Sequence, residues 1–278
     1  MPPTTRASST TASLWQRPSR VREVILKPEK IHLLDPGPLD PASNMALDEV
    51  LLESEDWWLR LTRWDRPCVT LGRFQPWPPH SPAPSDFPQI HPFSTANSDS
   101  TAAGLPAVRR VTGGGSIHHG EDLTIAIAGP CPSVPFPDRS PGRVAERISQ
   151  VIGRCLSPEI QSRGGEDREK EMVDVVDCFQ RKSPSDLVIE QDGQWVKAGG
   201  LALAFRPGRV LIEGSLHRDP TSRPQADDRS WIETLAQHWL GDGTDAIGPW
   251  QEELSGELQQ KVEEAVRQRF GTLEWNRR

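Results

Sequence analysis

The stretch that decides the fold is Arg109–Gly120, which reads RRVTGGGSIHHG. Its centre is a run of three glycines: Gly113, Gly114 and Gly115. These residues carry no side chains and tolerate positive φ, so a substrate can lie against bare backbone whose N–H groups are available to an oxygen or a phosphate. Arg109 and Arg110 just upstream could hold an anionic group. A flexible glycine turn between two strands would account equally well for these residues, so the flanking sequence has to decide.

Strands are predicted on both sides of the glycine run, from period-two alternation or from short apolar runs. They are Ile31–Leu34, Trp57–Trp64, Cys68–Gly72, Val108–Val111 and Leu123–Ala128. Asp40 followed by Pro41 predicts the start of a helix, because the aspartate can cap it and a proline at the first helical position loses no hydrogen bond. We expect this helix to continue to about Ser54. Ser140-Pro141 starts a second helix, which carries an apolar face.

Two hairpins are predicted further along the chain. The first pairs Asp186–Gln191 with Gln194–Ala198 around Asp192-Gly193, a dipeptide favoured in tight turns. The second pairs Leu201–Phe205 with Arg209–Leu216. Gln161–Lys170 is charged and contains glycine, so it is predicted to be a loop. Hairpins outnumber regular βαβ units, so we expect an α+β fold: a mixed, largely antiparallel sheet with flanking helices.

The chain divides into three predicted parts. Residues 1–22 contain Arg, Ser, Thr and Pro but no acidic residue, and are expected to form a disordered tail, although a targeting peptide has a similar composition. Residues 23–225 form the expected catalytic domain, with a mobile insertion at 76–106 that is dense in Pro, Ser, Asp and Asn. Residues 226–278 are expected to be a helical extension, because apolar residues recur every four positions there. These are Leu254, Leu258, Val262, Val266 and Phe270.

Composition limits the possible functions. The 278 residues carry a net charge of −7, so no global basic field points to nucleic acid or to a membrane surface. No apolar run is long enough to span a bilayer. The four cysteines form no CxxC pair, which argues against a structural zinc site and a thioredoxin-like motif. A cytoplasmic location is expected, and the N-terminal composition leaves an organelle open.

Lys197 lies in Trp195–Gly200, in a predicted strand that ends at two glycines. A lysine at this position could donate to an oxygen that gains negative charge in a transition state. For a lysine without further context, a solvated strand residue is the better interpretation. The fold around it has to decide between the two.

Cys178 lies in a charged stretch just before the strand that starts at Asp186. A loop cysteine near cations can have a lowered pKa and act as a nucleophile, whereas a half-buried inert thiol is about as probable from the residues alone. The other three cysteines, Cys68, Cys131 and Cys155, are expected to be inert. His118 and His119 are adjacent in a strand and therefore point to opposite faces, so no metal site is predicted.

The segment RRVTGGGSIHHGEDLTIAIAG resembles the hallmark of lipoate-protein ligases and octanoyltransferases, which are related in fold to biotin protein ligases. Further segments resemble the same superfamily in the same order across roughly residues 30 to 220. They are Asn44–Glu49, Val69–Gln75, Ser185–Val188, Lys197–Gly200 and Val210–Leu216. Agreement in order is more specific than any single motif. The resemblance implies the biotin/lipoyl protein ligase-like catalytic domain.

Cys178-Phe179 resembles one branch in particular, the cysteine-dependent octanoyltransferases of the LipM type. That likeness implies an acyl-enzyme on Cys178, formed from octanoyl-acyl carrier protein, with Lys197 steadying the oxyanion. A lysine of a lipoyl domain or of a glycine-cleavage H-type protein would then accept the octanoyl or lipoyl group, with no cofactor. The implied substrate-binding residues are Arg109, Arg110, Gly113, Gly114, Gly115, His118, Gly199 and Gly200.

Some positions depart from the family pattern. After the lysine, where the family usually has Gly-Ser-Ala-Gln, this chain has Gly199-Gly200-Leu201-Ala202-Leu203, and Glu213-Gly214 replaces the family's His-Gly. Two alternatives therefore stay open beside the transferase. One is an ATP- and Mg-dependent lipoate ligase that works through lipoyl-AMP. The other is a non-catalytic relative that binds lipoyl domains. The alternating Gly and Arg signature of biotin ligases is absent from the sequence, which makes biotin less probable.

Overall fold

The computed structural model describes residues 30–76, 105–133, 139–156, 161–162, 186–191, 194–217, 228–240 and 246–277. The predicted tail at 1–22, most of the predicted insertion at 76–106, and Cys178 lie outside the described residues.

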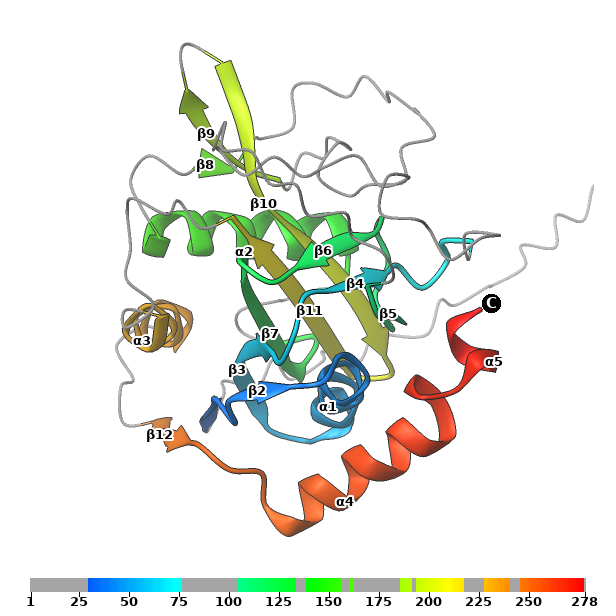
Figure 1. Cartoon of the computed structure of the whole chain (residues 1–278). Coiled ribbons are helices and arrows are strands. Elements are labelled where there is room, and N and C mark those ends of the chain that lie inside the picture. Colours follow the sequence, from blue (N-terminus) through cyan, green and yellow to red (C-terminus); the bar gives the residue numbers. More distant parts are fainter. Residues whose placement is uncertain are drawn as a thin grey trace, which may run out of the picture.

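A nine-stranded sheet forms the centre of the molecule, in the order β12-β1-β3-β7-β11-β10-β9-β8, with β2 beside β3 (Figure 1). Its strands are β1 (Ile31–Leu34), β2 (Pro38–Leu39), β3 (Trp57–Trp64), β7 (Leu123–Pro130), β8 (Gln161–Ser162), β9 (Leu187–Gln191), β10 (Gln194–Arg206), β11 (Arg209–Leu216) and β12 (Ile247–Gln251). The pairs from β3 through β7, β11 and β10 to β9 are antiparallel, whereas β1 is parallel to both β3 and β12. This mixed, largely antiparallel sheet confirms the predicted fold class.

A second sheet has three strands, in the order β5-β4-β6. They are β4 (Cys68–Leu71), β5 (Ala107–Arg109) and β6 (Ile117–His119). Strand β4 is parallel to β5 and antiparallel to β6. The glycine run lies between β5 and β6, so the predicted turn between two strands is present, and it connects the two outer strands of this small sheet.

Helix α1 (Pro41–Glu53) forms where Asp40 and Pro41 predicted it. The Asp40 carboxylate accepts hydrogen bonds from the backbone N–H groups of Ala42 and Ser43, at 3.0 and 3.1 Å. Capping of this kind is worth about 1 kcal/mol. The helix is buried along most of its length, and it buries polar as well as apolar side chains, Asp48 among them.

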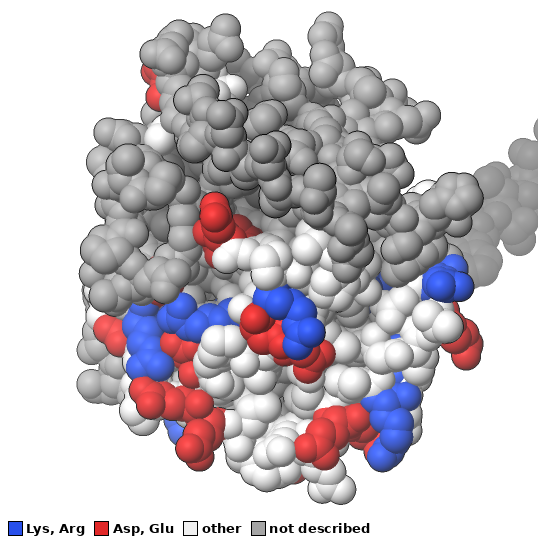
Figure 2. Space-filling model, viewed as in Figure 1, with Lys and Arg blue, Asp and Glu red and all other residues white. Residues whose placement is uncertain are grey.

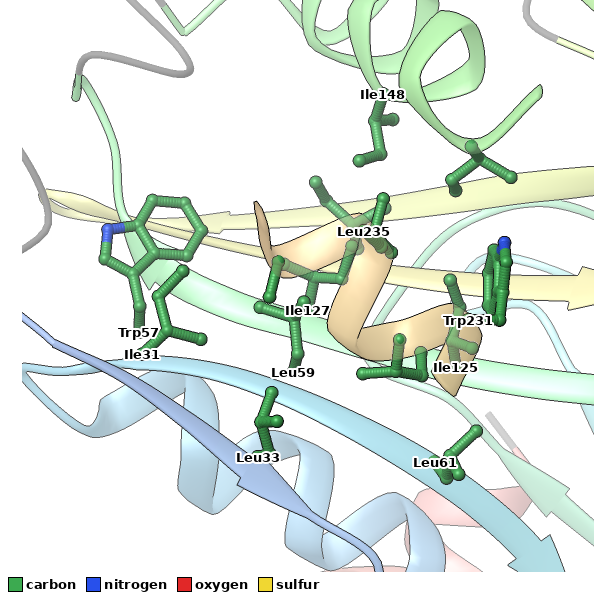
Figure 3. Close-up of a cluster of buried hydrophobic side chains, with 14 of the residues drawn as sticks. Ile31, Leu33, Trp57, Leu59, Leu61, Ile125, Ile127, Ile148, Trp231 and Leu235 are labelled. Carbon is green, nitrogen blue, oxygen red and sulfur yellow. The ribbon is translucent and has the colours of Figure 1, made fainter. Parts of the chain in front are cut away.

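One face of the large sheet carries large aliphatic side chains, which helices α2 (Pro141–Leu156) and α3 (Asp228–Leu240) cover. Figure 3 shows Leu59 and Ile127 from the sheet facing Ile148 of α2 and Leu235 of α3. All four of these side chains have no exposed surface. Burial of each contributes about 1.5–3 kcal/mol, so this layer is the main hydrophobic core.

The opposite face of the same sheet carries small and polar side chains. Register pairs Arg60 with Ala126, Ala126 with Glu213, and Glu213 with Ala202, which makes one row across four strands. The small residues of this row leave space above the sheet, whereas the opposite face is filled by large aliphatic side chains. Because side chains alternate along each strand, one short sequence supplies both a core face and a face for a site.

Two stretches differ from their predicted form. Strand β10 continues through Gly199 and Gly200 to Arg206, because both glycines pair with β11, whereas the sequence predicts that the strand ends there. Gln161–Ser162 pairs with β9 as a short strand, within a segment predicted to be a loop.

The C-terminal segment packs on the body, as predicted. It contains α4 (Gly256–Ala265), the π-helical turn η4 (Val266–Phe270) and α5 (Leu273–Asn276), which run along one side of the molecule from β12 (Figure 1). Val262 and Phe270 are buried against the cluster around α1. Strand β12 was not predicted from the sequence, and it extends the large sheet by pairing with β1.

The face shown in Figure 2 interleaves acidic and basic side chains over the described part of the molecule. This distribution agrees with the absence of a global basic field in the sequence. Among the described helices, none is long and apolar enough to cross a membrane.

Candidate functional site

A small pocket lies between α1, the three-stranded sheet and the polar face of the large sheet. Met45 and Asp48 from α1 line one wall, Thr70 and His119 from the small sheet line another, and the large sheet contributes Glu213 among others. Arg110 and Ile117, on either side of the glycine run, also line it. The pocket therefore lies where several of the motifs singled out in the sequence meet.

Arg110 holds the glycine run in shape. Its guanidinium donates to the carbonyl oxygens of Gly113 and Gly115, at 2.7 and 2.9 Å, and to the Thr70 hydroxyl at 2.8 Å. Gly114 has a φ of +92°, a backbone conformation that favours glycine. A Cβ on Gly72 would lie 1.9 Å from the Gly114 carbonyl oxygen. The run is therefore packed closely against the backbone of the strand-end turn at Gly72.

Arg109 has different surroundings from Arg110. Its fully buried guanidinium donates to the carbonyl oxygens of Gly72, Gln75 and Asn276, at 2.8, 2.5 and 3.0 Å. Its backbone N–H donates to Asn276 Oδ1, and its carbonyl oxygen accepts from Trp275 Nε1. Arg109 thus joins the C-terminal helix to the turn beside the glycine run. Of the two arginines, Arg110 is the one that lines the pocket.

His119 is the histidine that faces the pocket, whereas the sequence predicted a binding role for His118. His119 Nδ1 lies 2.8 Å from Asp122 Oδ2, and its Nε2 lies 2.8 Å from Thr70 Oγ1. Its ring stacks on Trp64 with the centroids 4.2 Å apart. His118 is half-buried outside the pocket lining. Side chains alternate along a strand, so His119 shares a face with the buried Ile117, whereas His118 points to the opposite face.

Asp122 is the shared hydrogen-bond partner of several polar side chains at this end of the pocket. It accepts hydrogen bonds from the hydroxyl groups of Ser215 and Thr124, at 2.7 and 2.8 Å, in addition to its contact with His119. Burial opposes the charge, but His119 and the three hydrogen bonds outweigh burial and hold the pKa of Asp122 well below its usual range. Asp122 is therefore a fixed negative charge that orients the His119 ring.

Lys197 lies on β10, the strand that contributes Ala202 to the pocket lining. Its Nζ is 2.9 Å from Asp186 Oδ1, and both side chains are largely buried, with 12% and 6% exposed. A β-bulge between Lys197 and Gly199 changes the alternation of β10, so the amine lies beside Gly200. A Cβ on Gly200 would lie 3.4 Å from that Nζ. Asp186 was not among the predicted site residues, although it lies in the quoted Ser185–Val188 segment.

The pairing of β10 with β11 joins Lys197 to the pocket. Gly200 pairs with Ser215, whose hydroxyl donates to Asp122. His217 follows β11 and donates its backbone N–H to the Ala198 carbonyl oxygen at 2.8 Å. Burial and Lys197 lower the pKa of His217, while Asp122 opposes them. The charges of Lys197 and of Asp122 therefore both act on the His217 ring. His217 was not among the site residues predicted from the sequence.

A buried carboxyl pair lies deeper in the pocket. Burial and the nearby Asp48 raise the pKa of Glu213 to about 7, against the opposing effects of Arg110, Thr112 and Arg60. Burial likewise raises the pKa of Asp48, although Arg60 Nη1 lies 2.5 Å from Asp48 Oδ1. Glu213 belongs to Glu213-Gly214, one of the positions at which the sequence departs from the family pattern. The sequence did not predict that Asp48 of α1 lies beside it.

The chain is similar in sequence to octanoyltransferases and in fold to lipoate-protein ligases. No protein-family model matches the chain. The octanoyltransferase LipM of Moorella thermoacetica is 33% identical over 203 residues, which cover 68% of this chain and 65% of that protein, just under two thirds of its length. The octanoyltransferase LipM of Bacillus subtilis is 27% identical over 70% of this chain and 67% of that protein.

The solved structure of a lipoate-protein ligase A bound with ATP superposes with a TM-score of 0.61 at 17% identity, over 89% of this chain and 98% of that one. The bi-partite lipoate protein ligase of Thermoplasma acidophilum gives a TM-score of 0.58 at 16% identity, over 91% of this chain and 96% of that one. The chain belongs to the lipoate-protein ligase and octanoyltransferase superfamily.

The motif that resembles the cysteine-dependent octanoyltransferases contains Cys178, which lies outside the described residues. The described cysteines are poor candidates for a nucleophile. Burial raises the pKa of Cys68 far above its usual range, and burial raises that of Cys155 to about 11, against Arg154. Cys131 is fully buried. These values support the prediction that the three are inert.

Among the residues that the structure describes, no group of three or more His, Cys, Asp or Glu side chains could hold a metal ion.

Proposed function

We propose that the chain is a protein acyltransferase that attaches an octanoyl or lipoyl group to a lysine of an acceptor protein. The observation that carries the proposal is the Lys197–Asp186 ion pair beside Gly200, which pairs with Ser215 of the pocket lining. The relatives named octanoyltransferase LipM support it at the level of the family. Octanoyl-acyl carrier protein is the proposed donor. A lipoyl domain or a glycine-cleavage H-type protein is the proposed acceptor.

The proposed nucleophile is Cys178, eight residues before Asp186. Its thiolate attacks the thioester carbonyl of the donor, and the Lys197 ammonium stabilises the oxyanion of the tetrahedral intermediate. The carrier thiolate leaves and takes up a proton. The neutral ε-amine of the acceptor lysine then attacks the acyl-enzyme, loses a proton, and expels the Cys178 thiolate. An amide forms and a thioester is consumed, so no nucleotide or metal is needed.

Asp186 would act by positioning Lys197. An ammonium group paired with a buried carboxylate is held in one place on a flexible four-carbon stem. The adjoining β-bulge directs the same amine toward Gly200, which has no side chain to block it. A substrate carbonyl next to this glycine could therefore approach the amine closely.

Intact-mass measurement tests the proposal directly. The purified protein is incubated with octanoyl-acyl carrier protein, and we expect an added mass of one octanoyl group that is sensitive to hydroxylamine. Cys178→Ser should abolish the thioester adduct, whereas the matched control Cys155→Ser should retain it. Equal labelling of wild type and Cys178→Ser would contradict the acyl-enzyme.

The ATP-dependent ligase makes a different prediction. It requires pyrophosphate release that depends on lipoate, ATP and Mg²⁺ and that continues in Cys178→Ser. The same incubations, with added acceptor domain, distinguish the two chemistries. A non-catalytic relative would bind the acceptor domain without any transfer. Transfer that is lost in Lys197→Ala would exclude that third possibility.

A further inference from the structure

His217 lies at the end of β11 that is closest to Lys197 on the neighbouring strand. It follows β11 directly, and its backbone N–H donates to the Ala198 carbonyl oxygen at 2.8 Å, which continues the pairing with β10. Side chains alternate along a strand, so His217 shares a face with Ser215, whereas Leu216 belongs to the hydrophobic core on the other face. The sheet therefore directs the imidazole to the polar side.

The Lys197 amine lies on the same side of the sheet. Gly200 pairs with Ser215, and paired residues of two antiparallel strands point to one side. A Cβ on Gly200 would lie 3.4 Å from Lys197 Nζ and 3.8 Å from Asp186 Oδ1. An imidazole, an ammonium group and a carboxylate are therefore gathered on one face where β10 and β11 pair.

The surroundings of His217 favour its uncharged form. Burial lowers the pKa of His217 from its ordinary value of 6.5, Asp122 opposes this effect, and Lys197 adds to it. Lys197 acts on the ring from β10, where it is paired with Asp186, and Asp122 acts from the segment before β7. At neutral pH the ring is therefore uncharged, and a neutral imidazole has a nitrogen lone pair that can accept a proton.

The other polar side chains at this end are poorer proton acceptors. The Asp186 carboxylate is paired with the Lys197 ammonium, which has no lone pair. The pKa of Asp122 is held well below its usual range by His119 and by hydrogen bonds, which makes it a weak base. His119 has a hydrogen-bond contact at each ring nitrogen. Among the described residues near Lys197, His217 is therefore the best suited to take up a proton.

We propose that His217 is the general base that accepts the proton of the acceptor amine when this amine attacks the acyl-enzyme. The inference rests on the proposed function, in which that proton has no assigned acceptor. The amine nitrogen forms a bond to the acyl carbon, a proton passes from this nitrogen to the imidazole, and the bond from the acyl carbon to Cys178 Sγ breaks. The thiolate leaves with the electron pair, and the imidazolium releases its proton to water. A positioned base contributes about 10²–10⁴-fold to such a step.

Separate measurement of the two half-reactions tests this role. Octanoyl-acyl carrier protein acylates the full chain, and the isolated acyl-enzyme is then mixed with a purified lipoyl domain. In His217→Gln we expect acylation of Cys178 to change by less than about threefold, and transfer to the lipoyl domain to slow by about 10²-fold or more. An unchanged transfer rate in this variant would overturn the inference. His238→Gln, at an exposed histidine of α3, is the matched control and should keep both rates.

The pH dependence of transfer separates a proton acceptor from a residue that only supports the structure. The wild-type rate should rise with pH as the acceptor amine loses its proton, and it should fall more steeply below a pH lower than 6.5, where the imidazole is protonated as well. His217→Gln should keep the amine dependence and lose the steeper part. A wild-type profile without the steeper part contradicts the proposal, and this measurement needs no variant. Equal loss of acylation and transfer in His217→Gln would mean a structural role and would also contradict it.

Failure of the proposed function would look different. If the wild type gains no octanoyl mass from the carrier protein, the acyl-enzyme is wrong, and the role of His217 as its base is wrong with it. If the wild type is acylated and transfers the group, and His217→Gln transfers it equally fast, acyl transfer stands and only the role of His217 is wrong.

Discussion

The Nζ atom of Lys197 lies 2.9 Å from Oδ1 of Asp186, and the bulge that follows Lys197 places this ion pair beside Gly200. The pair is largely buried, so each charge depends on the other for its stability. Asp186 directly precedes β9 and Lys197 lies in β10, and they meet because β9 and β10 pair as antiparallel neighbours. Their relationship leads to the first prediction.

Asp186→Asn should lower the rate of acyl transfer by about tenfold or more, because Lys197 loses the charge that holds its amine in place. Lys197→Ala should cost about 10²–10³-fold, the usual effect of removing an oxyanion donor. Single-turnover transfer to an acceptor domain measures both. Asp56→Asn, at an exposed carboxylate, is the control. An unchanged rate in Asp186→Asn would show that Lys197 needs no positioning partner.

Gly72→Ala should destabilise the protein much more than Gly113→Ala. A Cβ on Gly72 would lie 1.9 Å from the Gly114 carbonyl oxygen, so backbone must move, whereas a Cβ on Gly113 has no heavy atom within 4 Å. We expect a loss of about 2–4 kcal/mol for Gly72→Ala and under about 1 kcal/mol for Gly113→Ala. Urea denaturation of both variants checks this difference. Equal losses would mean that the two segments are not in close contact.

Asn276→Ala should weaken the attachment of the C-terminal helix to Arg109, although the contacts of Arg109 with the Asn276 backbone carbonyl and with Trp275 remain. Asn276 Oδ1 accepts from the Arg109 backbone N–H, and Asn276 Nδ2 donates to the carbonyl oxygens of Phe270 and Thr272. Their loss leaves buried groups unpaired, at a cost of about 2–3 kcal/mol. Thermal unfolding measures the effect. The exposed neighbour Arg277 provides the control, and Arg277→Ala should change stability by less than about 0.5 kcal/mol. A similar small change in Asn276→Ala would refute the link.

Glu213 should make stability fall as the pH rises. Its pKa is about 7 in the folded protein and 4.5 in the reference state, so the folded state holds the proton more tightly. The stabilisation is complete below pH 4.5 and is lost as the pH rises to about 7, with a magnitude of about 3 kcal/mol. Glu213→Gln should reduce this slope in a series of denaturation curves between pH 5 and 8, while Asp48, whose pKa burial also raises, keeps its own contribution. A slope that is unchanged in the variant would contradict the assignment to Glu213.

Much of the fold could be predicted from local patterns. Asp40 and Pro41 predict α1 because capping involves only neighbouring residues, and Trp57–Trp64 predicts β3 because alternation is local. Strand β12 could not be predicted, because Ile247–Gln251 is defined by its pairing with β1, more than 200 residues away in sequence. The continuation of β10 through Gly199 and Gly200 was missed for the same reason. Two glycines usually end a strand, unless a long partner such as β11 holds them in place.

The sequence by itself determined the elements around the glycine run, the likeness to a superfamily, and Lys197 as a candidate. Only the tertiary structure decided which side chains meet. It brought His119 and Arg110, and not His118 and Arg109, into the pocket lining, and it brought Asp48 of α1 against Glu213 of β11. The physical reason is that burial and pairing are properties of the packed interior. A carboxyl group acquires a perturbed pKa only when distant segments close over it and exclude water.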